Sequence, residues 1–182
     1  GEIRGERCIF KRQVDDFALA TSNAETAHIF YDLIDDLLTI PMKRFGLVTL
    51  FNGCDVVQSK HYIKMSTETY ITKISERHLV NWMQDQKDLA DLPLPIPTSE
   101  SFLKSFKSTT GDPCEKVQAA LEKEYKFKYR SGIGEIIYAM VTCRPDVAPA
   151  VCQCAQHSVA PAKIHFNAVR HMLKYLYATK DK

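Results

Sequence analysis

Two adjacent carboxylates, Asp15 and Asp16, are the residues whose types and spacing point most directly to chemistry. Cys8-Ile9-Phe10 precedes them and the apolar residues 17–20 follow, which predicts a β-hairpin with both acids at its tip. Adjacent like charges repel and need a positive partner. Carboxylate oxygens are hard ligands that suit magnesium or manganese. Asp15 and Asp16 are therefore the candidate catalytic and metal-binding residues.

A second pair, Asp35-Asp36, shows that the dipeptide alone is not specific. It lies in a helical pattern with Asp32 nearby, and we interpret it as the polar face of a helix. The surroundings of Asp15 and Asp16 must therefore decide whether they bind a metal.

The first pair needs a helix and a second hairpin to position it. Ser22-x-x-Glu25 has the form of a capping box and predicts a core-packing helix that ends before Pro41. Residues 47–57 and 61–65 are rich in β-formers and predict a hairpin that turns at 58–60. The apolar positions of the helix recur at helical spacing: Phe30, Leu33, Ile34 and Leu37.

The rest of the chain is predicted to be mainly helical. Ser66 can cap a helix in which one side carries Ile71, Ile74, His78 and Trp82, with His78 interpreted as a core histidine. Residues 87–128, which contain alternating prolines, predict a linker. A second helical region starts near Tyr129. Pro149 predicts a bend or a delayed start in the helix that follows residues 144–146.

The last helix, residues 162–178, has the clearest amphipathic pattern. Its apolar stripe is Phe166, Val169, Leu173 and Leu176. Lys163, Arg170 and Lys174 lie on a stripe opposite, which is either an ordinary solvated face or a track for a nucleic-acid phosphate backbone.

Bulk properties set only wide limits. The chain has 182 residues, 45% of them hydrophobic, and a net charge of +2, which neither requires nor excludes a nucleic-acid partner. The six cysteines lack a disulfide spacing, and there is no signal peptide or long apolar run. We therefore expect a cytoplasmic or nuclear protein, or one inside an intracellular particle, with no membrane partner. The start at Gly1, without methionine, indicates a fragment of a longer chain.

The motifs occur in the order found in one polymerase family. The chain resembles the reverse transcriptase of copia-type LTR retrotransposons. The matching segments are Val14-Asp15-Asp16-Phe17; Phe45-Gly46 through the second hairpin to Tyr70-Ile71; Tyr129-Arg130-Ser131 with Ile133-Gly134-Glu135 and Ile137-Tyr138; Thr142-Cys143-Arg144-Pro145-Asp146; and residues 168–176.

The resemblance implies an α+β fold with part of a right-hand polymerase: a partial palm in 1–65, a thumb-like helix in 66–86, the linker in 87–128, and a helical thumb and connection region in 129–182. It implies an RNA-directed DNA polymerase that uses two magnesium ions, with manganese as a substitute, on an RNA template and a DNA primer. Asp15 matches the metal-binding aspartate and Asp16 its neighbour. Gln13 stands where the family has a tyrosine beside the primer end, and the second hairpin is expected near that end.

The family's other catalytic aspartate and its fingers belong to an upstream segment, and an RNase H domain follows downstream. We therefore expect this chain alone not to polymerise nucleotides. Two alternatives stay open. One is a non-catalytic nucleic-acid-binding remnant that keeps the basic helix, and the other is a helical interaction domain in which the aspartates have no metal role.

Overall fold

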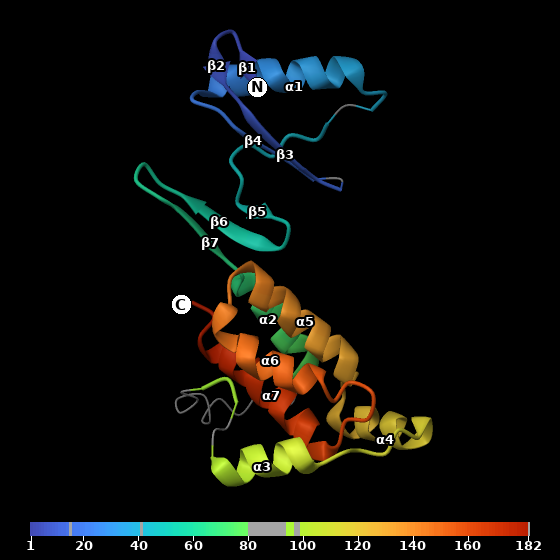
Figure 1. Cartoon of the computed structure of the whole chain (residues 1–182). Coiled ribbons are helices and arrows are strands. Elements are labelled where there is room, and N and C mark those ends of the chain that lie inside the picture. The colour runs from blue at the N-terminus through green and yellow to red at the C-terminus, as the bar shows by residue number, and fades with distance from the viewer. Residues whose placement is uncertain (15, 41, 80–93, 97–98, 182) are drawn as a thin grey trace. The chain divides into compact units, whose positions relative to one another are not determined.

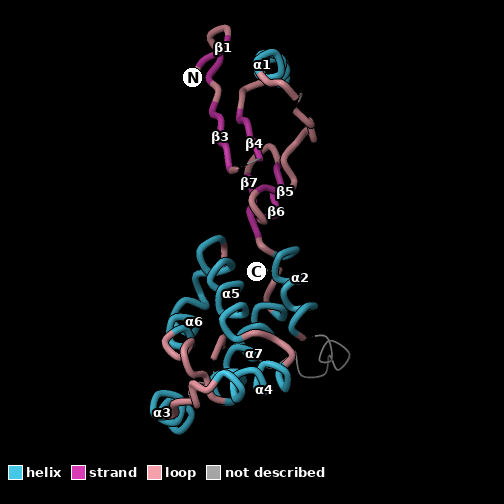
Figure 2. The backbone as a smooth tube through the Cα atoms, turned by 90° about the vertical axis from the view of Figure 1, so that its right-hand side faces the viewer, coloured by secondary structure: helices cyan, strands magenta, loops and turns pink. Residues whose placement is uncertain are grey.

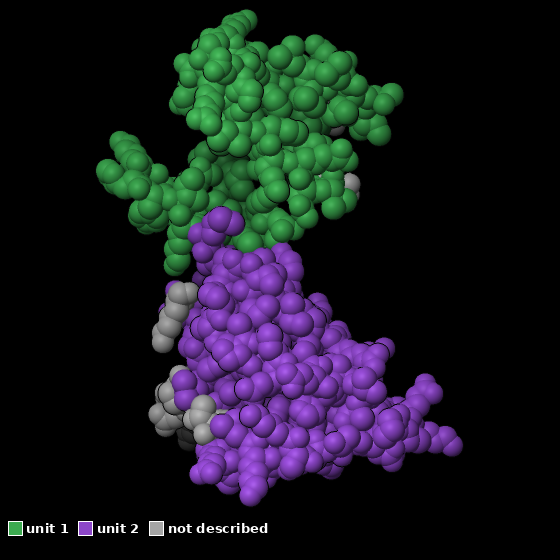
Figure 3. Space-filling view, viewed as in Figure 1, with its two compact units in different colours: residues 1–64 green, residues 65–182 purple. Residues whose placement is uncertain are grey.

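The computed structural model describes residues 1–14, 16–40, 42–79, 94–96 and 99–181. The chain divides into two compact units, residues 1–64 and residues 65–182 (Figure 3). Unit 1 contains short β-sheets and one helix, and unit 2 is helical (Figures 1 and 2). This mixture of helices and small antiparallel sheets agrees with the predicted α+β class. The assignment of the segments to a polymerase palm and thumb stays a prediction.

The predicted first hairpin is confirmed. Strands β3 (Ile9–Gln13) and β4 (Asp16–Ala20) pair antiparallel, with Gln13 opposite Asp16. A shorter hairpin precedes it, made of β1 (Glu2–Ile3) and β2 (Glu6–Arg7). The chain therefore reverses between Gln13 and Asp16, where the sequence placed the tip.

Helix α1 (Ala24–Leu37) packs on this hairpin through aromatic rings. Phe10 stacks on Phe17, with ring centroids 5.4 Å apart, and its centroid lies 5.0 Å from that of Phe30 in α1. The predicted capping box is wrong. Asn23 is the N-cap and accepts a hydrogen bond from the Thr26 amide at 2.8 Å, because the Ser22 hydroxyl donates to Glu6 instead.

The apolar side of α1 is only partly buried. Leu33 is 53% exposed and Leu37 is 81% exposed, so the prediction of an ordinary core-packing helix is wrong for these two positions. The hairpin beneath has two strands, and such a small sheet offers too little surface to cover a whole helix face.

The second sheet has three strands in the order β5 (Leu50–Phe51), β6 (Cys54–Gln58) and β7 (Ile63–Ser66). The predicted hairpin between 47–57 and 61–65 is confirmed in its second part, but the chain reverses over 59–62 rather than 58–60: Gln58 ends β6, and the Ser59 amide donates to the Tyr62 carbonyl at 2.9 Å. The expectation of one continuous strand over 47–57 is wrong. Asn52 and Gly53 have φ of 48° and 72°, which is the geometry of a tight hairpin turn.

The described residues of unit 2 include α2 (Glu68–His78), α3 (Glu100–Ser108), α4 (Glu115–Tyr125), α5 (Tyr129–Thr142), the short 3₁₀ helix η2 (Pro145–Val147), α6 (Ala148–Ala155) and α7 (Lys163–Ala178). Helices α2, α5 and α6 pack against α7 (Figure 1). The predicted apolar stripes are confirmed: Ile71, Ile74, Phe166, Val169, Leu173 and Leu176 are all buried.

Three details of unit 2 differ from the sequence expectation. The linker expected over 87–128 contains α3 and α4, which bury Phe106, Leu121 and Tyr125 in the core. The N-cap of α2 is Thr67 rather than Ser66, and its side chain makes no capping hydrogen bond. Trp82, expected on the same helix, lies outside the described residues.

The delayed helix after residues 144–146 is confirmed. Pro145 begins η2, and α6 begins only at Ala148, with Pro149 in its first turn. A first-turn proline loses no helical hydrogen bond. This local start fixes the segment that leads from α5 to α6.

Candidate functional site

The tip of the first hairpin is strained and exposed. Val14 has φ of 52° and is 72% exposed, although β-branched residues rarely adopt the left-handed region. The Arg12 Nε–H donates to the Val14 carbonyl at 3.1 Å. Asp16, the first residue of β4, is exposed, while Asp15 lies outside the described residues. Strained backbone is often retained at functional sites, so this tip is the candidate site.

Alternation along the strands places Asp16 and Gln13 on one face of the hairpin. They oppose each other across the ladder, and paired residues share a face. Phe17, next along β4, belongs to the other face, where it stacks on Phe10 and lies under the Arg12 guanidinium at 6.0 Å. The aromatic cluster that holds α1 therefore does not cover Asp16. Gln13 is half-buried.

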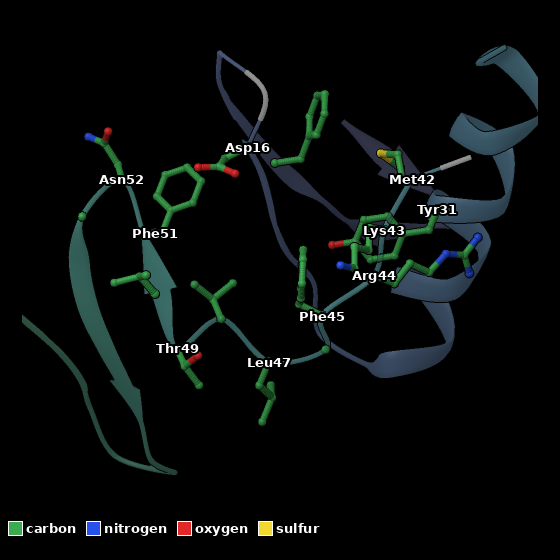
Figure 4. Close-up of a pocket in the computed structure, with 15 residues that line it drawn as sticks. Asp16, Tyr31, Met42, Lys43, Arg44, Phe45, Leu47, Thr49, Phe51 and Asn52 are labelled. Carbon is green, nitrogen blue, oxygen red and sulfur yellow. The ribbon is translucent and has the colours of Figure 1, made fainter. Parts of the chain in front are cut away.

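A pocket of about 510 Å³ adjoins Asp16 within unit 1 (Figure 4). Its walls come from β4, from Tyr31 of α1, and from residues 42–53, which include the Asn52–Gly53 turn. Asp16 and Phe51 are among the labelled side chains that line this space in Figure 4. Sequence reasoning missed residues 42–46 as part of the site, because no local pattern shows that they face β4.

The second aspartate pair has a different environment. Asp35 accepts from the Met42 amide at 2.8 Å and from the Arg44 guanidinium at 2.5 Å, and Asp32 accepts from the same guanidinium at 2.8 Å. The Met42 amide, followed by Arg44, lowers the pKa of Asp35. Asp36 is exposed. The pair thus fixes the chain after α1, which agrees with its interpretation as a helix face.

The described residues do not complete a metal site. Among them, no group of three or more histidine, cysteine, aspartate or glutamate side chains is placed to hold a metal ion. Asp16 offers one exposed carboxylate, and magnesium prefers one or two carboxylates completed by water or substrate oxygens. The magnesium site at the hairpin stays a prediction, since Asp15 lies outside the described residues.

The predicted basic stripe lies on α7, and its members have different environments. Lys163 is exposed and pairs with Glu124 of α4 at 2.8 Å. The Arg170 guanidinium lies 4.7 Å over the Tyr125 ring and donates to the Tyr125 carbonyl at 3.4 Å. Lys174 is half-buried. Part of the stripe thus packs against α4, which is compatible with either predicted role.

The first block of motif residues in α5 joins that helix to its neighbours. The buried Tyr129 hydroxyl donates to the Cys154 carbonyl at 2.8 Å, and the Arg130 Nε–H donates to the Ser158 carbonyl at 2.8 Å. A Cβ at Gly132 would lie 3.3 Å from the Phe127 ring. Glycine, which has no Cβ, therefore lets α5 lie this close to the Phe127 ring without displacing it.

Two motif segments that are distant in sequence meet between α2 and α5. The Tyr70 hydroxyl donates to the Glu135 carbonyl at 3.1 Å, and its ring lies 4.8 Å from that of Tyr138. Burial raises the pKa of Tyr70 to about 12. Arg77 and His78 both pair with the Glu135 carboxylate. His78 is buried as predicted, although its Nδ1 has no hydrogen-bond partner among the described residues.

The segment 142–146 anchors the end of α7. Arg144 is buried and binds the Asp146 carboxylate through two hydrogen bonds of 2.9 and 2.7 Å. The same guanidinium donates to the Thr179 carbonyl at 3.1 Å. Tyr175 donates its hydroxyl to Asp146 at 2.9 Å. The hydrogen bond from Arg144 is the main cause that lowers the pKa of Asp146. These motif residues therefore have structural roles.

Three known proteins share sequence similarity with the chain. It is 31% identical over 140 residues to the retrovirus-related Pol polyprotein from transposon TNT 1-94 of Nicotiana tabacum, a match of 76% of the chain and 10% of the polyprotein. It is 27% identical over 173 residues to a putative transposon Ty5-1 protein of Saccharomyces cerevisiae, covering 92% of the chain and 48% of that protein. The third is the secreted RxLR effector protein 161 of Plasmopara viticola, 40% identical over 52 residues, which covers 29% of the chain and 37% of that protein.

Similarity to two transposon proteins supports a retrotransposon origin for the chain. The chain spans about a tenth of the tobacco polyprotein and about half of the yeast protein. No protein-family model matches it, and no solved structure matches it. Among the described residues, no helix combines the length and apolar character needed to cross a membrane.

Proposed function

We propose that the chain is the C-terminal part of the polymerase region of a copia-type reverse transcriptase, an RNA-directed DNA polymerase. The observation that carries the proposal is the strained, exposed tip of the β3–β4 hairpin, which presents Asp16 directly after Asp15 in the sequence. The similarity to the tobacco Pol polyprotein supports it. In this proposal Asp15 is the catalytic metal ligand and Asp16 its neighbour.

The pocket beside Asp16 also supports the proposal. It brings the Asn52–Gly53 turn and Phe51 next to the aspartate within one unit. The proposed role of this second hairpin is to lie near the primer end, with Gln13 contacting the primer. A concave, partly aromatic surface beside a carboxylate suits a nucleotide, whose bases stack on aromatic rings.

The proposed activity needs more than this chain. Magnesium, or manganese, would supply charge stabilisation for the transferred phosphoryl group in the complete enzyme. Asp15 and Asp16 come from a single hairpin, and the rest of the ligand set would come from an upstream segment. The RNA template, the DNA primer, that upstream segment and a downstream RNase H domain are the proposed partners.

Primer extension tests the proposal. The chain would replace its matching segment in the tobacco transposon polyprotein, and the chimera would be given an RNA template, a DNA primer and magnesium or manganese. We expect extension by the chimera and none by the isolated chain. Extension by the isolated chain would refute the requirement for an upstream segment, and an inactive but folded chimera would favour the non-catalytic alternative.

The second candidate is a non-catalytic remnant that binds nucleic acid, and the geometry around Arg170 favours it. The guanidinium is held over Tyr125 and bonded to its carbonyl, next to the exposed Lys126. Lys128 is exposed two residues further on. Together with Lys163 and Lys174, these cations could follow the phosphates of an RNA–DNA duplex.

Salt-dependent binding tests this candidate. In fluorescence anisotropy with an RNA–DNA duplex, replacing Lys163, Arg170 and Lys174 by glutamine should weaken binding. It should also reduce the slope of log K against log salt by about 1 for each lost phosphate contact. A matched control replaces three exposed lysines of α2 and α3: Lys73, Lys104 and Lys107. Equal effects of the two triple variants would show that only net charge matters.

A further inference from the structure

Two histidines stack where α3 meets the start of α7. The rings of His157 and His165 lie 3.8 Å apart and almost parallel. Phe106 of α3 meets both rings edge-on, at 5.1 Å from His157 and 4.8 Å from His165. His165 is fully buried. Burying a charged imidazole in such a site is costly unless a partner compensates it.

The hydrogen bonds of His165 fix its neutral form. The Ala162 amide donates to Nδ1 at 2.9 Å, so that nitrogen carries no proton. Nε2 therefore carries the proton and donates to the Phe106 carbonyl at 3.1 Å. Both ring nitrogens are occupied in the neutral state. A second proton, on Nδ1, would face the Ala162 N–H and remove that capping bond.

Charged groups on the surrounding elements do not compensate such a proton. Glu124 of α4 pairs with Lys163, and Asp112 accepts the Cys114 amide. The other acids on these helices are Glu100 of α3, Glu115 and Glu122 of α4, and Glu135 of α5. The cations on the same helices are Lys104 and Lys107 of α3, Lys116 and Lys123 of α4, Arg130 of α5, and Lys163, Arg170 and Lys174 of α7. Burial is the main cause that lowers the pKa of His165; its hydrogen bond to the Phe106 carbonyl raises this pKa, and His157 lowers it. Burial also lowers the pKa of His157. The site thus favours two neutral rings.

This junction attaches α3 to α7. Phe106 inserts into the core, and its carbonyl is bound by His165. The segment before α7 also holds the chain after α3, since the Gly111 amide donates to the Ala160 carbonyl at 2.9 Å. A Cβ at Gly111 would lie 2.6 Å from that backbone. Releasing the histidine contact would therefore loosen one short helix and its connection.

We propose that the stacked pair His157–His165 is an acid-sensitive latch that holds α3 against α7 and releases it at mildly acidic pH, while α5 and α7 stay folded. The midpoint lies below the ordinary histidine pKa of about 6.5 because the folded state disfavours the proton. The stabilisation is complete above pH 6.5 and is lost as the pH falls. The latch does not depend on the chain's being part of a polymerase.

His78 provides an internal contrast. It is also buried, but its Nε2 pairs with the Glu135 carboxylate. The carboxylate beside His78 distinguishes its surroundings from those of His165, whose ring nitrogens face a backbone amide and a backbone carbonyl.

Amide hydrogen exchange on the whole chain, corrected for intrinsic rates between pH 7.5 and 5.0, tests the latch. Below the midpoint, the amides of α3 should lose protection by about tenfold per pH unit for one proton taken up. The amides of α5 and α7 should keep theirs. Constant protection of α3, or simultaneous loss in α3, α5 and α7, would overturn the proposal.

Two variants test whether the histidine pair causes the loss of α3 protection in acid. In His157→Phe the stacked ring remains without its charge, so the loss of α3 protection should move to lower pH or disappear. His171→Gln, which alters a histidine bonded to the Leu94 carbonyl, should leave the midpoint unchanged. An unchanged midpoint in His157→Phe together with a shifted midpoint in His171→Gln would show that the pair is not responsible. NMR titration of the His165 ring in the unaltered chain gives a measurement that does not depend on the folding of either variant. A titration midpoint at or above pH 6.5 would contradict the latch.

Discussion

The two units differ sharply in how much of their apolar surface they bury. In unit 2 the described core joins α2 to α7 through residues such as Ile136, Phe166 and Leu173, all fully buried. In unit 1 the buried hydrophobic residues among those described are Cys8 and Cys54, and many large apolar side chains are exposed: Ile9, Leu33, Leu37, Ile40, Phe45, Leu47, Leu50 and Ile63.

This difference separates the motifs that hold the fold from the motif that could do chemistry. The most specific sequence block, which begins at Tyr129, belongs to the well-packed unit and makes structural contacts. The aspartate hairpin belongs to the unit with little core of its own. Exposed apolar surface of this extent is typical of a region that contacts another protein segment, which fits the proposed dependence on an upstream segment.

The largest expected effect compares one apolar helix position in each unit. Phe166→Ala should lower the free energy of unfolding by about 3–5 kcal/mol, because it empties a buried site. Leu37→Ala should change it by no more than about 0.5 kcal/mol, because Leu37 is exposed. Urea unfolding followed by circular dichroism measures both. Equal losses would mean that α1 is packed as tightly as α7.

The next comparison sets an ion pair with one buried partner, Arg144, against a pair in which both partners are exposed. Asp146→Asn removes the charge that faces the buried Arg144 and should cost about 1–3 kcal/mol. Lys163→Gln breaks the exposed pair with Glu124 and should cost less than about 1 kcal/mol.

The pH dependence sharpens this comparison. The pKa of Asp146 in the folded chain is lowered from 3.8, so its contribution is complete above that value and is lost as the pH falls below it. Urea titrations at pH 7 and pH 3 should therefore show the cost of Asp146→Asn shrinking in acid. A cost that stays constant would show that the carboxylate charge is not what matters.

A smaller effect concerns the strained tip. Val14→Gly should stabilise the hairpin by about 1 kcal/mol, since glycine adopts positive φ without a steric penalty. Val57→Gly, in the regular strand β6, should destabilise its hairpin by about 0.5–1 kcal/mol. Amide exchange of β3–β4 and β5–β6 reads each hairpin separately. If both substitutions changed the stability of their hairpins in the same direction, strain at Val14 would be excluded.

Periodicity predicted the elements whose burial is local. Helix α7 could be predicted directly, because its apolar residues recur at helical spacing: Phe166, Val169, Leu173 and Leu176. The helices α3 and α4 were missed because a segment rich in serine, threonine and proline obscured the pairs Phe102–Phe106 and Leu121–Tyr125, which are four residues apart. Asn52-Gly53 was a readable hairpin signal that the prediction overlooked.

The candidate site was predictable in part. The hairpin and its tip followed from the alternation around Asp15 and Asp16. The pocket did not, because it depends on residues 42–53 folding back toward β4. The role of Asp35 was hidden for the same reason, since its partner Arg44 lies nine residues away beyond the end of α1. Contacts of this kind are set by tertiary structure rather than by local pattern.

The two aspartate pairs allow the most direct test of the proposed function. In the chimera with the tobacco polyprotein, Asp15→Asn should reduce primer extension by about a hundredfold or more, because it removes charge from the proposed reaction centre. Asp36→Asn, in the pair that lies on α1, should leave extension nearly unchanged. Full activity of the Asp15→Asn chimera, or equal losses in both variants, would contradict the proposal that the β3–β4 hairpin carries the catalytic aspartate.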